Sequence, residues 1–226
     1  MTLYELKNQF PAAPEYLTQI LLIERDNGIV PNARLADRLE VSRPAVSQAV
    51  GRLKKLGLVD QDRYGAIGLS SSGRNIAEKV VRRHFLLEHL LVNVLQFPWD
   101  KSDTEAGLLQ DSVSDELTEH LAEHLGNPKT CPHGNPFPGS DIEKSYLEAP
   151  SLTDAEESVK VKIIRITEEG EMTEGMLTFC QNNGIAPGII LTVKSHTPEN
   201  TICEYKSDTL TVPAAFAGFI RWEAFK

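Results

Sequence analysis

"SRPAVSQAVGRLKKLGLV", residues 42–59, carries the clearest structural signal in the N-terminal part of the chain. Ser42 is a natural N-cap, Pro44 suits a first helical turn, and Gly57 stands where helices commonly close. Between them the apolar residues recur at three- and four-residue spacing, at Val46, Val50, Leu53 and Leu56. The pattern predicts one amphipathic helix.

The flanking segments extend this helix into a small domain. Residues 16–26 carry a helical apolar stripe that stops before Asn27-Gly28, and residues 33–41 form a second, shorter helical pattern. Residues 58–70 overlap the end of the quoted stretch, and their apolar and polar residues alternate around a turn, which is typical of a hairpin. Three short helices followed by a hairpin predict a winged helix-turn-helix.

The distribution of charge favours DNA as the partner of this domain, although the chain as a whole carries a net charge of −9. Residues 43–83 hold nine basic and three acidic residues, whereas residues 84–157 hold three basic and fifteen acidic ones. A basic block is the electrostatic footprint of phosphate binding, and the acidic block beside it is a candidate cation site.

The second helix of a helix-turn-helix enters the major groove with its N-terminal residues facing the bases. Gln48 can pair with an adenine edge, and the small Ser42 and Pro44 permit close approach. Phosphate-contacting chemistry is offered by Arg43, Ser47, Arg52, Lys54 and Lys55, and by Arg63 in the predicted wing. Winged helices also mediate protein contacts, but the basic block makes double-stranded DNA the preferred interpretation.

The rest of the chain reads as helices followed by a small β domain. A long helix is expected over residues 73–95, and two shorter ones over 102–110 and 114–125. Residues 127–158 contain five prolines and little periodicity, so we expect a linker that packs in part on its neighbours. Five short strand patterns then predict an SH3-like (FeoA-like) barrel.

The expected fold class is therefore mainly α with a small β domain. The expected domains are a winged helix-turn-helix over residues 1–73, a helical dimerisation and metal-binding domain over 74–147, and a linker with the SH3-like barrel over 148–226. The 226 residues contain no apolar run long enough to span a membrane, so we expect a soluble, cytoplasmic protein without a membrane partner. Three scattered cysteines indicate reduced thiols.

His84 and Glu88 form the clearest metal-ligand pattern. On a helix, residues four apart lie about 40° apart around the axis, so both side chains can bind one ion, whereas His89 lies about 140° from His84. Taken alone, such a pair is more often a surface pair. The spacing matches no metallohydrolase motif, and no nucleophile and base are paired, so we expect neither an enzyme nor a small-molecule substrate.

Taken together, several segments resemble the diphtheria-toxin-repressor family of metal-dependent transcriptional regulators, the DtxR, IdeR and MntR group. The resemblance covers most of the chain. It is carried by the quoted stretch, by "LSSSGRNIAEKVVRRHFLLEHLL" at 69–91, by "SDEL" at 114–117 and by "GNPFPG" at 134–139. It implies a homodimer that binds palindromic operator DNA and represses metal-homeostasis genes when loaded with metal.

The resemblance also implies metal ligands. His84 and Glu88 match one family site, and Asp103 falls where iron-type members place a histidine of that site. "CPHG" at 131–134 resembles a segment of manganese-responsive members, which makes Cys131 and His133 candidates. A carboxylate from the barrel would complete the site, and the sequence leaves it open among four residues, Glu168, Glu169, Glu171 and Glu174.

The family's second, activating site looks altered in this chain. Glu15 stands where the family supplies a ligand from the first helix, but the three matching positions of the later helix hold Gly107, Gln110 and Asp111. Only Glu15 and Asp111, with Gln110, remain as oxygen donors. The site is weakened, rebuilt or absent, and a regulator of the same fold without metal activation stays an alternative.

The types of the candidate ligand atoms limit which metals the site can bind. Histidine, carboxylate and thiolate suit Mn²⁺ or Fe²⁺, and also Zn²⁺ or Co²⁺ in vitro, because affinity order alone favours zinc over manganese. The oxygen-rich remainder around Glu15 and Asp111 favours the harder ions, Mn²⁺ or Fe²⁺. A third interpretation makes the barrel a peptide-binding module, but its aromatic residues are more simply core.

Overall fold

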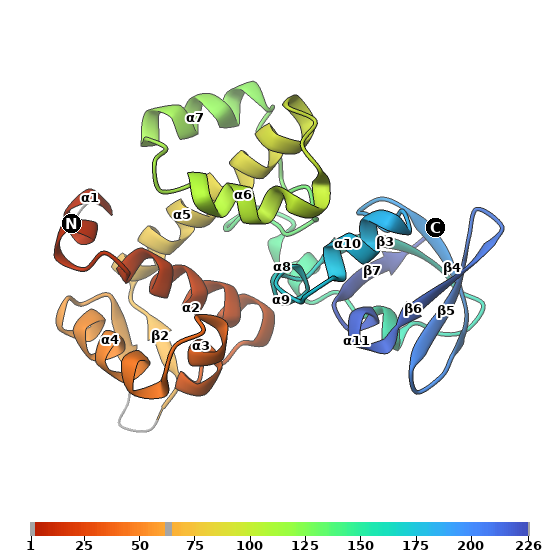
Figure 1. Ribbon diagram of the computed structural model, residues 1–226, viewed down its shortest axis with the longest axis horizontal. Helices are drawn as coiled ribbons and strands as arrows, with labels where there is room; N and C mark the ends of the chain where they lie inside the picture. The colour runs from red at the N-terminus through yellow and green to blue at the C-terminus, as the bar shows by residue number, and fades with distance from the viewer. Residues whose placement is uncertain (1–2, 62–64, 226) are drawn as a thin grey trace. The chain divides into compact units, whose positions relative to one another are not determined.

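The computed structural model describes residues 3–61 and 65–225. The chain divides into two compact units, residues 1–83 and 84–226, and helix α5 (Ser71–His89) begins in the first and ends in the second. Figure 1 labels the α-helices of both units and the strands β2 to β7.

The first unit is the expected helix-turn-helix with its hairpin. Its elements before α5 are α1 (Leu3–Gln9), α2 (Ala13–Asn27), α3 (Asn32–Arg38), α4 (Arg43–Lys55), β1 (Val59–Gln61) and β2 (Ile67–Leu69). Helix α1 was not expected from the sequence, and α2 begins three residues before the predicted stripe. The predicted wing turn at residues 62–64, with Arg63, lies outside the described residues.

Helix α4 forms where its sequence pattern predicts. The Ser42 hydroxyl accepts a hydrogen bond from the Ala45 N–H at 3.3 Å, which satisfies one of the donors that a helix start leaves unpaired. The apolar stripe of α4 is buried, with Val46 and Leu53 fully inaccessible to solvent. This stripe packs in the core of the unit, so the polar face of α4 is left at the surface.

The second unit begins with helices. After α5 come a π-helical turn η1 (Leu90–Val94), a 3-10 turn η2 (Trp99–Lys101), α6 (Ser102–Leu109), α7 (Asp115–His124) and α8 (Glu143–Leu147). Helix α7 starts at an N-cap, since the Ser114 hydroxyl accepts from the Leu117 N–H at 3.1 Å. The expected long helix over 73–95 is interrupted, because its α-helical hydrogen bonding ends at His89 and a wider turn follows.

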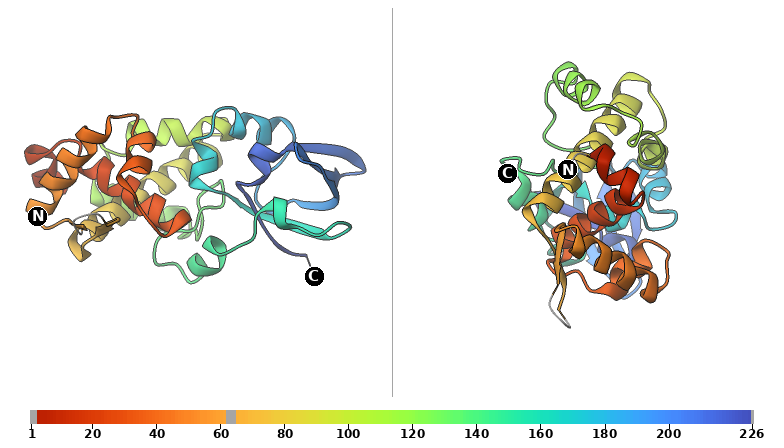
Figure 2. Two further views of the ribbon diagram at one scale, coloured as in Figure 1. Left: turned by 90° about the horizontal axis from the view of Figure 1, so that it is seen from below. Right: turned by 90° about the vertical axis from the view of Figure 1, so that its left-hand side faces the viewer.

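An antiparallel sheet closes the described part of the second unit. Its five strands lie in the order β6-β5-β4-β3-β7. They are β3 (Lys160–Ile166), β4 (Ile190–His196), β5 (Asn200–Tyr205), β6 (Asp208–Pro213) and β7 (Ile220–Ala224), with η3 (Leu152–Asp154), α9 (Glu168–Glu171), α10 (Met176–Asn182) and α11 (Ala214–Ala217) between or before them. Met176, Leu177 and Cys180 of α10 share one core with the strands, and Figures 1 and 2 show α10 beside the sheet.

The proline-rich segment 127–158 is held on its neighbours over much of its length. Leu152 and Ala155 belong to the core of the sheet. The Trp222 indole N–H donates to the Ser151 carbonyl at 2.8 Å. The segment therefore connects elements and also fixes their positions within the unit.

Two further sequence expectations concern the chain as a whole. Among the described residues, none of the helices combines the length and the apolarity that a membrane span requires. The cysteines, all three of them described, are buried free thiols: Cys131, Cys180 and Cys203. The boundaries of three domains at 73 and 147 stay a prediction.

Candidate metal centre and DNA-binding face

Three segments of the second unit bring metal-binding side chains together. The end of α5 supplies His84 and Glu88, α6 supplies Asp103, and the segment after α7 supplies Cys131 and His133. Two groups of potential ligands form, Glu88 with Cys131 and His133, and His84 with Glu88 and Asp103. Within each group, one ligand atom per residue lies within 4.8 Å of the others. Glu88 belongs to both groups.

The Glu88 carboxylate lies at the centre of this arrangement and has no solvent exposure. Its Oε1 lies 2.8 Å from His84 Nε2, and its Oε2 lies 3.0 Å from His133 Nδ1. The two oxygens of one side chain therefore face two different imidazoles. The His84 Nε2 also lies 3.1 Å from Asp103 Oδ1.

A tight turn at residues 130–136 positions Cys131 and His133. The Cys131 N–H donates to the Asn135 carbonyl at 2.8 Å, and the Gly134 N–H donates to the Cys131 carbonyl at 2.9 Å. Gly134 has a φ of +93°, and a Cβ there would lie 2.1 Å from the Ile164 carbonyl oxygen of β3. The turn therefore requires glycine, both for its left-handed conformation and for its close approach to the sheet.

His133 is held from both sides of its ring. Its Nε2 donates to the Trp99 carbonyl at 3.0 Å, and its ring centre lies 4.4 Å from that of Trp99. With Nε2–H engaged in this way, the Nδ1 lone pair can point to Glu88 and Cys131. A backbone partner on the far nitrogen is the usual device that fixes the tautomer of a metal-binding histidine.

Helix α9 adds a buried carboxylate to the cluster. The Thr167 hydroxyl caps this helix by accepting from the Gly170 N–H at 3.1 Å. Glu168 and Glu171 are both buried, and Glu171 Oε1 lies 3.6 Å from His133 Nδ1 and accepts from the Asn135 side-chain amide. Glu171 is therefore the barrel carboxylate that the structure brings beside His133.

The protonation of the cluster reflects a surplus of buried acids. Burial opposes the charged form of Glu88, but the charges and hydrogen bonds of His133 and His84 outweigh it and hold the Glu88 pKa well below its usual range. Burial and the neighbouring Glu168 and Glu88 raise the Glu171 pKa well above its ordinary value.

The imidazoles and the thiol respond to the same acids. Burial alone would lower the pKa of His84 and of His133, but their carboxylate partners raise both. Burial, followed by the charges of Glu88 and Glu171, raises the Cys131 pKa well above that of a free thiol. The cluster thus holds protons that a divalent cation can replace.

The chemistry of these residues fits a divalent transition metal. In the described part of the chain, Glu171 Oε2 is buried without a hydrogen-bond partner, which is an expensive arrangement unless a cation compensates it. A thiol, imidazoles and carboxylates together suit Mn²⁺, Fe²⁺, Co²⁺ or Zn²⁺.

Some sequence candidates lie elsewhere. Glu15 is exposed on α2 in the first unit, whereas Asp111 and Glu174 are exposed in the second unit. A Cβ at Gly107 would meet open space. Gln110 is engaged with His84, since its Oε1 lies 3.1 Å from His84 Nδ1.

Sequence reasoning missed three contributors, Trp99, Asn135 and the role of Gln110. Their partners are backbone groups or side chains from distant segments, so no local pattern marks them. His89, excluded on geometry, has its Nε2 on the Thr130 carbonyl at 2.5 Å and its Nδ1 beside the Asn93 amide. It thereby holds the start of the turn that carries Cys131.

The start of α4 presents a polar face to solvent in the first unit. Its exposed residues are Ser42, Arg43, Pro44, Ser47 and Gln48. Ser47 is fixed by its own hydrogen bond to the Arg43 carbonyl at 3.1 Å, and it accepts from the Asn32 side chain at 3.3 Å. Arg52 is also exposed but packs over the Phe10 ring at 4.4 Å, so it supports α1 as well.

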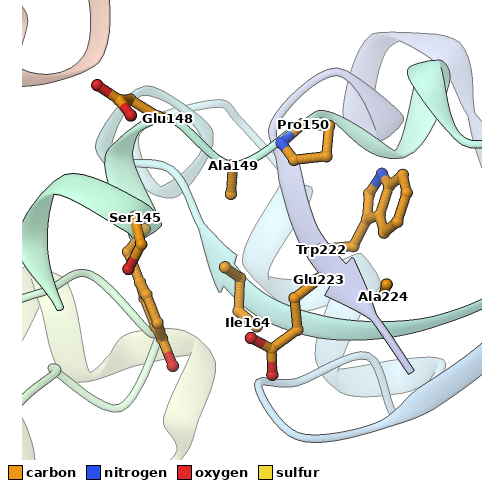
Figure 3. A pocket seen from close by; sticks show the side chains of 9 residues that line it. Ser145, Glu148, Ala149, Pro150, Ile164, Trp222, Glu223 and Ala224 are labelled. Atoms are coloured by element: carbon orange, nitrogen blue, oxygen red, sulfur yellow. The ribbon is translucent and has the colours of Figure 1, made fainter. Parts of the chain in front are cut away.

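A cavity of about 280 Å³ lies between α8 and β7, apart from the metal-binding side chains. Figure 3 shows Trp222, Pro150 and Ile164 on its walls. The carboxylate of Glu223 at its edge already pairs with Lys162 at 2.9 Å. The cavity offers an apolar wall and no group of metal ligands among the described residues.

A helix-turn-helix with an exposed polar face on α4 and a unit with a buried metal-ligand cluster define a metal-responsive DNA-binding protein. Comparison with known proteins agrees. Residues 11–67 match the N-terminal DNA-binding domain of iron dependent repressors, and residues 70–139 match their metal-binding and dimerisation domain. The chain belongs to this family of metal-responsive transcriptional repressors, the diphtheria-toxin-repressor family.

Relatives and solved structures extend the match over nearly the whole chain. The iron-dependent repressor IdeR of Mycobacterium leprae is 31% identical over 219 residues, which cover 92% of this chain and 95% of the relative. The diphtheria toxin repressor of Corynebacterium diphtheriae is 34% identical over 171 residues, covering 72% and 75%. A manganese-dependent transcriptional repressor in complex with manganese superposes with a TM-score of 0.81 at 30% identity, covering 94% and 100%.

Proposed function

We propose that this repressor is switched by Mn²⁺ or Fe²⁺ bound through Glu88, Cys131, His133 and Glu171, with His84 and Asp103 on the other side of Glu88. The observation that carries the proposal is the central position of Glu88, whose two oxygens face His133 and His84. The bound ion would supply positive charge to a buried cluster rich in acids. Manganese and iron are favoured because the matching relatives bear those metals in their names.

The ligands come from separate segments of the chain, and this indicates how an ion would order the second unit. Glu88 belongs to α5, Cys131 and His133 to the turn at 130–136, and Glu171 to α9. These segments are far apart in the sequence, and the cluster holds buried carboxylates that repel one another without a cation. An ion would replace that repulsion by attraction and so tie the end of α5 to the barrel.

The symmetry of a homodimer would connect metal binding to DNA binding. A homodimer presents two α4 helices to the two halves of a palindrome, and the half-sites lie a fixed number of helical turns apart. Ordering of α5, which continues from the first unit into the second, would favour one spacing of these helices. A modest preference of this kind suffices to change operator affinity severalfold or more.

We propose domain boundaries near residues 73 and 147, a role that needs no catalysis, and action in the cytoplasm. Reading residues on the α4 face would be Ser42, Arg43, Pro44, Ser47, Gln48 and Arg52, and Arg63 stays a candidate from the sequence alone. A regulator that has lost metal control is not favoured, because the family relatives are named for their metals and the donor cluster is present in this chain.

Metal titration of the full chain tests the proposal. The variant His133→Ala should bind Mn²⁺ far more weakly than the wild type in isothermal titration calorimetry, and operator binding of this variant should no longer respond to Mn²⁺. The matched control is His120→Ala on α7, an exposed histidine outside both ligand groups. Equal loss in both variants, or loss in neither, would contradict the assignment.

A further inference from the structure

Gln110 lies just after the last residue of α6 and faces the ring of His84. Its Oε1 is 3.1 Å from His84 Nδ1, while His84 Nε2 lies 2.8 Å from Glu88 Oε1 and 3.1 Å from Asp103 Oδ1. The two nitrogens of one imidazole therefore have partners of different kinds. The amide oxygen is on one side, and the carboxylates of the ligand cluster are on the other.

The partner of Nδ1 decides what Nε2 can do. A neutral imidazole carries its proton on one nitrogen and a lone pair on the other, and only the lone pair can bind a metal. An amide oxygen only accepts hydrogen bonds, so Gln110 Oε1 retains the proton on Nδ1. When His84 loses its other proton to bind an ion, the lone pair is therefore on Nε2, the nitrogen that faces Glu88 and Asp103.

Two side chains from the region of helix α6 contact the two nitrogens of the His84 ring. Asp103 is in its first turn, and Gln110 follows seven residues later, so the two side chains lie on the same side of the helix after almost two whole turns. The position of Gln110 is set by the helix itself, because its N–H donates to the Ala106 carbonyl at 2.9 Å. Both His84 and Gln110 are partly buried, which limits competition from water.

We propose that Gln110 is a positioning residue of the metal centre, which fixes the tautomer and ring plane of His84 so that Nε2 is the ligand nitrogen. This inference rests on the proposed function, in which His84 belongs to the centre. It replaces the sequence interpretation of Gln110 as a leftover oxygen donor of the activating site. Gln110 acts through His84 and does not itself hold the ion.

The test compares metal affinity in variants of the full chain. In Gln110→Leu the acceptor is lost, and we expect Zn²⁺ and Mn²⁺ affinity to fall about ten- to a hundredfold, the usual cost of losing such an outer partner. In Gln110→Glu the acceptor is kept, and affinity should stay at or above that of the wild type. Thr104→Leu, an exposed change on the same helix, is the control and should leave affinity unchanged.

A spectroscopic signature separates positioning from a general structural role. With ¹⁵N-labelled histidine and diamagnetic Zn²⁺, the wild type and Gln110→Glu should show one His84 form, protonated at Nδ1 and bound through Nε2. Gln110→Leu should show a mixture of tautomers or binding through Nδ1. If Gln110→Leu does not fold, as judged by circular dichroism, Gln110→Ala takes its place with the same expectation.

The possible outcomes are distinguishable. Wild-type affinity and an unchanged His84 spectrum in Gln110→Leu, together with weaker binding in His84→Ala, would overturn the role of Gln110 alone. If His84→Ala itself bound metal as tightly as the wild type, the assignment of His84 to the centre would fail, and this inference with it. Equal weakening in Gln110→Leu and Thr104→Leu would show an effect of helix stability, and would also overturn the inference.

Discussion

Replacement of Gly134 by alanine tests whether the turn at 130–136 is built around a close approach to β3. Two costs are expected. The φ of +93° is unfavourable for an L-residue by about 1–2 kcal/mol. The added Cβ would also lie 2.1 Å from the Ile164 carbonyl oxygen and 2.6 Å from the Arg165 Cα, both backbone atoms that cannot rotate away.

The clash of the added Cβ with the backbone of β3 sets the size of the expected destabilisation. Because real Cβ contacts essentially never fall below 3.0 Å, the turn or the strand must shift by roughly 1 Å, and such overpacking costs about 1–3 kcal/mol. Gly139→Ala is the matched control in the same segment, since its φ is +77° and nothing lies within 4 Å of its Cβ. Both variants share the strain and the gain from a stiffer unfolded chain, so their difference isolates the close approach.

The assay is urea unfolding in the presence of a chelator, followed by tryptophan fluorescence. Both tryptophans, Trp99 and Trp222, belong to the second unit, so the signal reports on the unit that carries the turn. We expect Gly134→Ala to lose about 1–3 kcal/mol more free energy of unfolding than Gly139→Ala. It should also bind Mn²⁺ more weakly, because His133 moves with the turn. Equal destabilisation of the two variants would refute the reasoning.

Three further predictions follow from the site and the reading face. The carboxylate partners raise the pKa of His84 and of His133. The two protonated histidines therefore stabilise the metal-free protein fully below about pH 6.5, and this stabilisation is lost as pH rises through their folded-state pKa values. The Tm measured in chelator should fall from pH 6 to pH 9, and saturating Mn²⁺ should remove that fall. Gln48→Ala should cost about 1–3 kcal/mol of operator binding and relax the preference for one base pair, as measured by competition with substituted duplexes. Arg43→Ala should weaken all duplexes alike and reduce the slope of log affinity against log salt by about 1 in anisotropy titrations.

Local chemistry explains why much of the fold could be predicted from the sequence. The N-cap Ser42, the spacing of Val46 and Leu53, and the alternation of the last strands are all short-range signals, and each gave the element that the structure contains. The wide turn at Leu90–Val94 has no such signal, because apolar spacing continues through it while the hydrogen bonding changes. A helix predicted from spacing alone therefore ran past its true end at His89.

The candidate site, too, could be predicted from the sequence only in part. Helical geometry places His84 and Glu88 on one side of one helix, and the family resemblance makes the pair a predicted metal site. The choice of Glu171 over Glu174 could not be predicted, since both are acids of one short region, and only the fold buries Glu171 on α9 and leaves Glu174, beyond the end of that helix, exposed. Gln110 was equally hidden, because its contact with His84 depends on the placement of α6 against α5.

The most direct test of the central claim, that metal at the Glu88 cluster controls DNA binding, is fluorescence anisotropy with a palindromic duplex that the protein itself selects from a random library. The affinity should be measured with Mn²⁺ and with chelator, for the wild type and for Glu88→Gln. We expect tighter binding with Mn²⁺ in the wild type and no response to Mn²⁺ in Glu88→Gln. An operator affinity that is the same with and without metal in the wild type would contradict it.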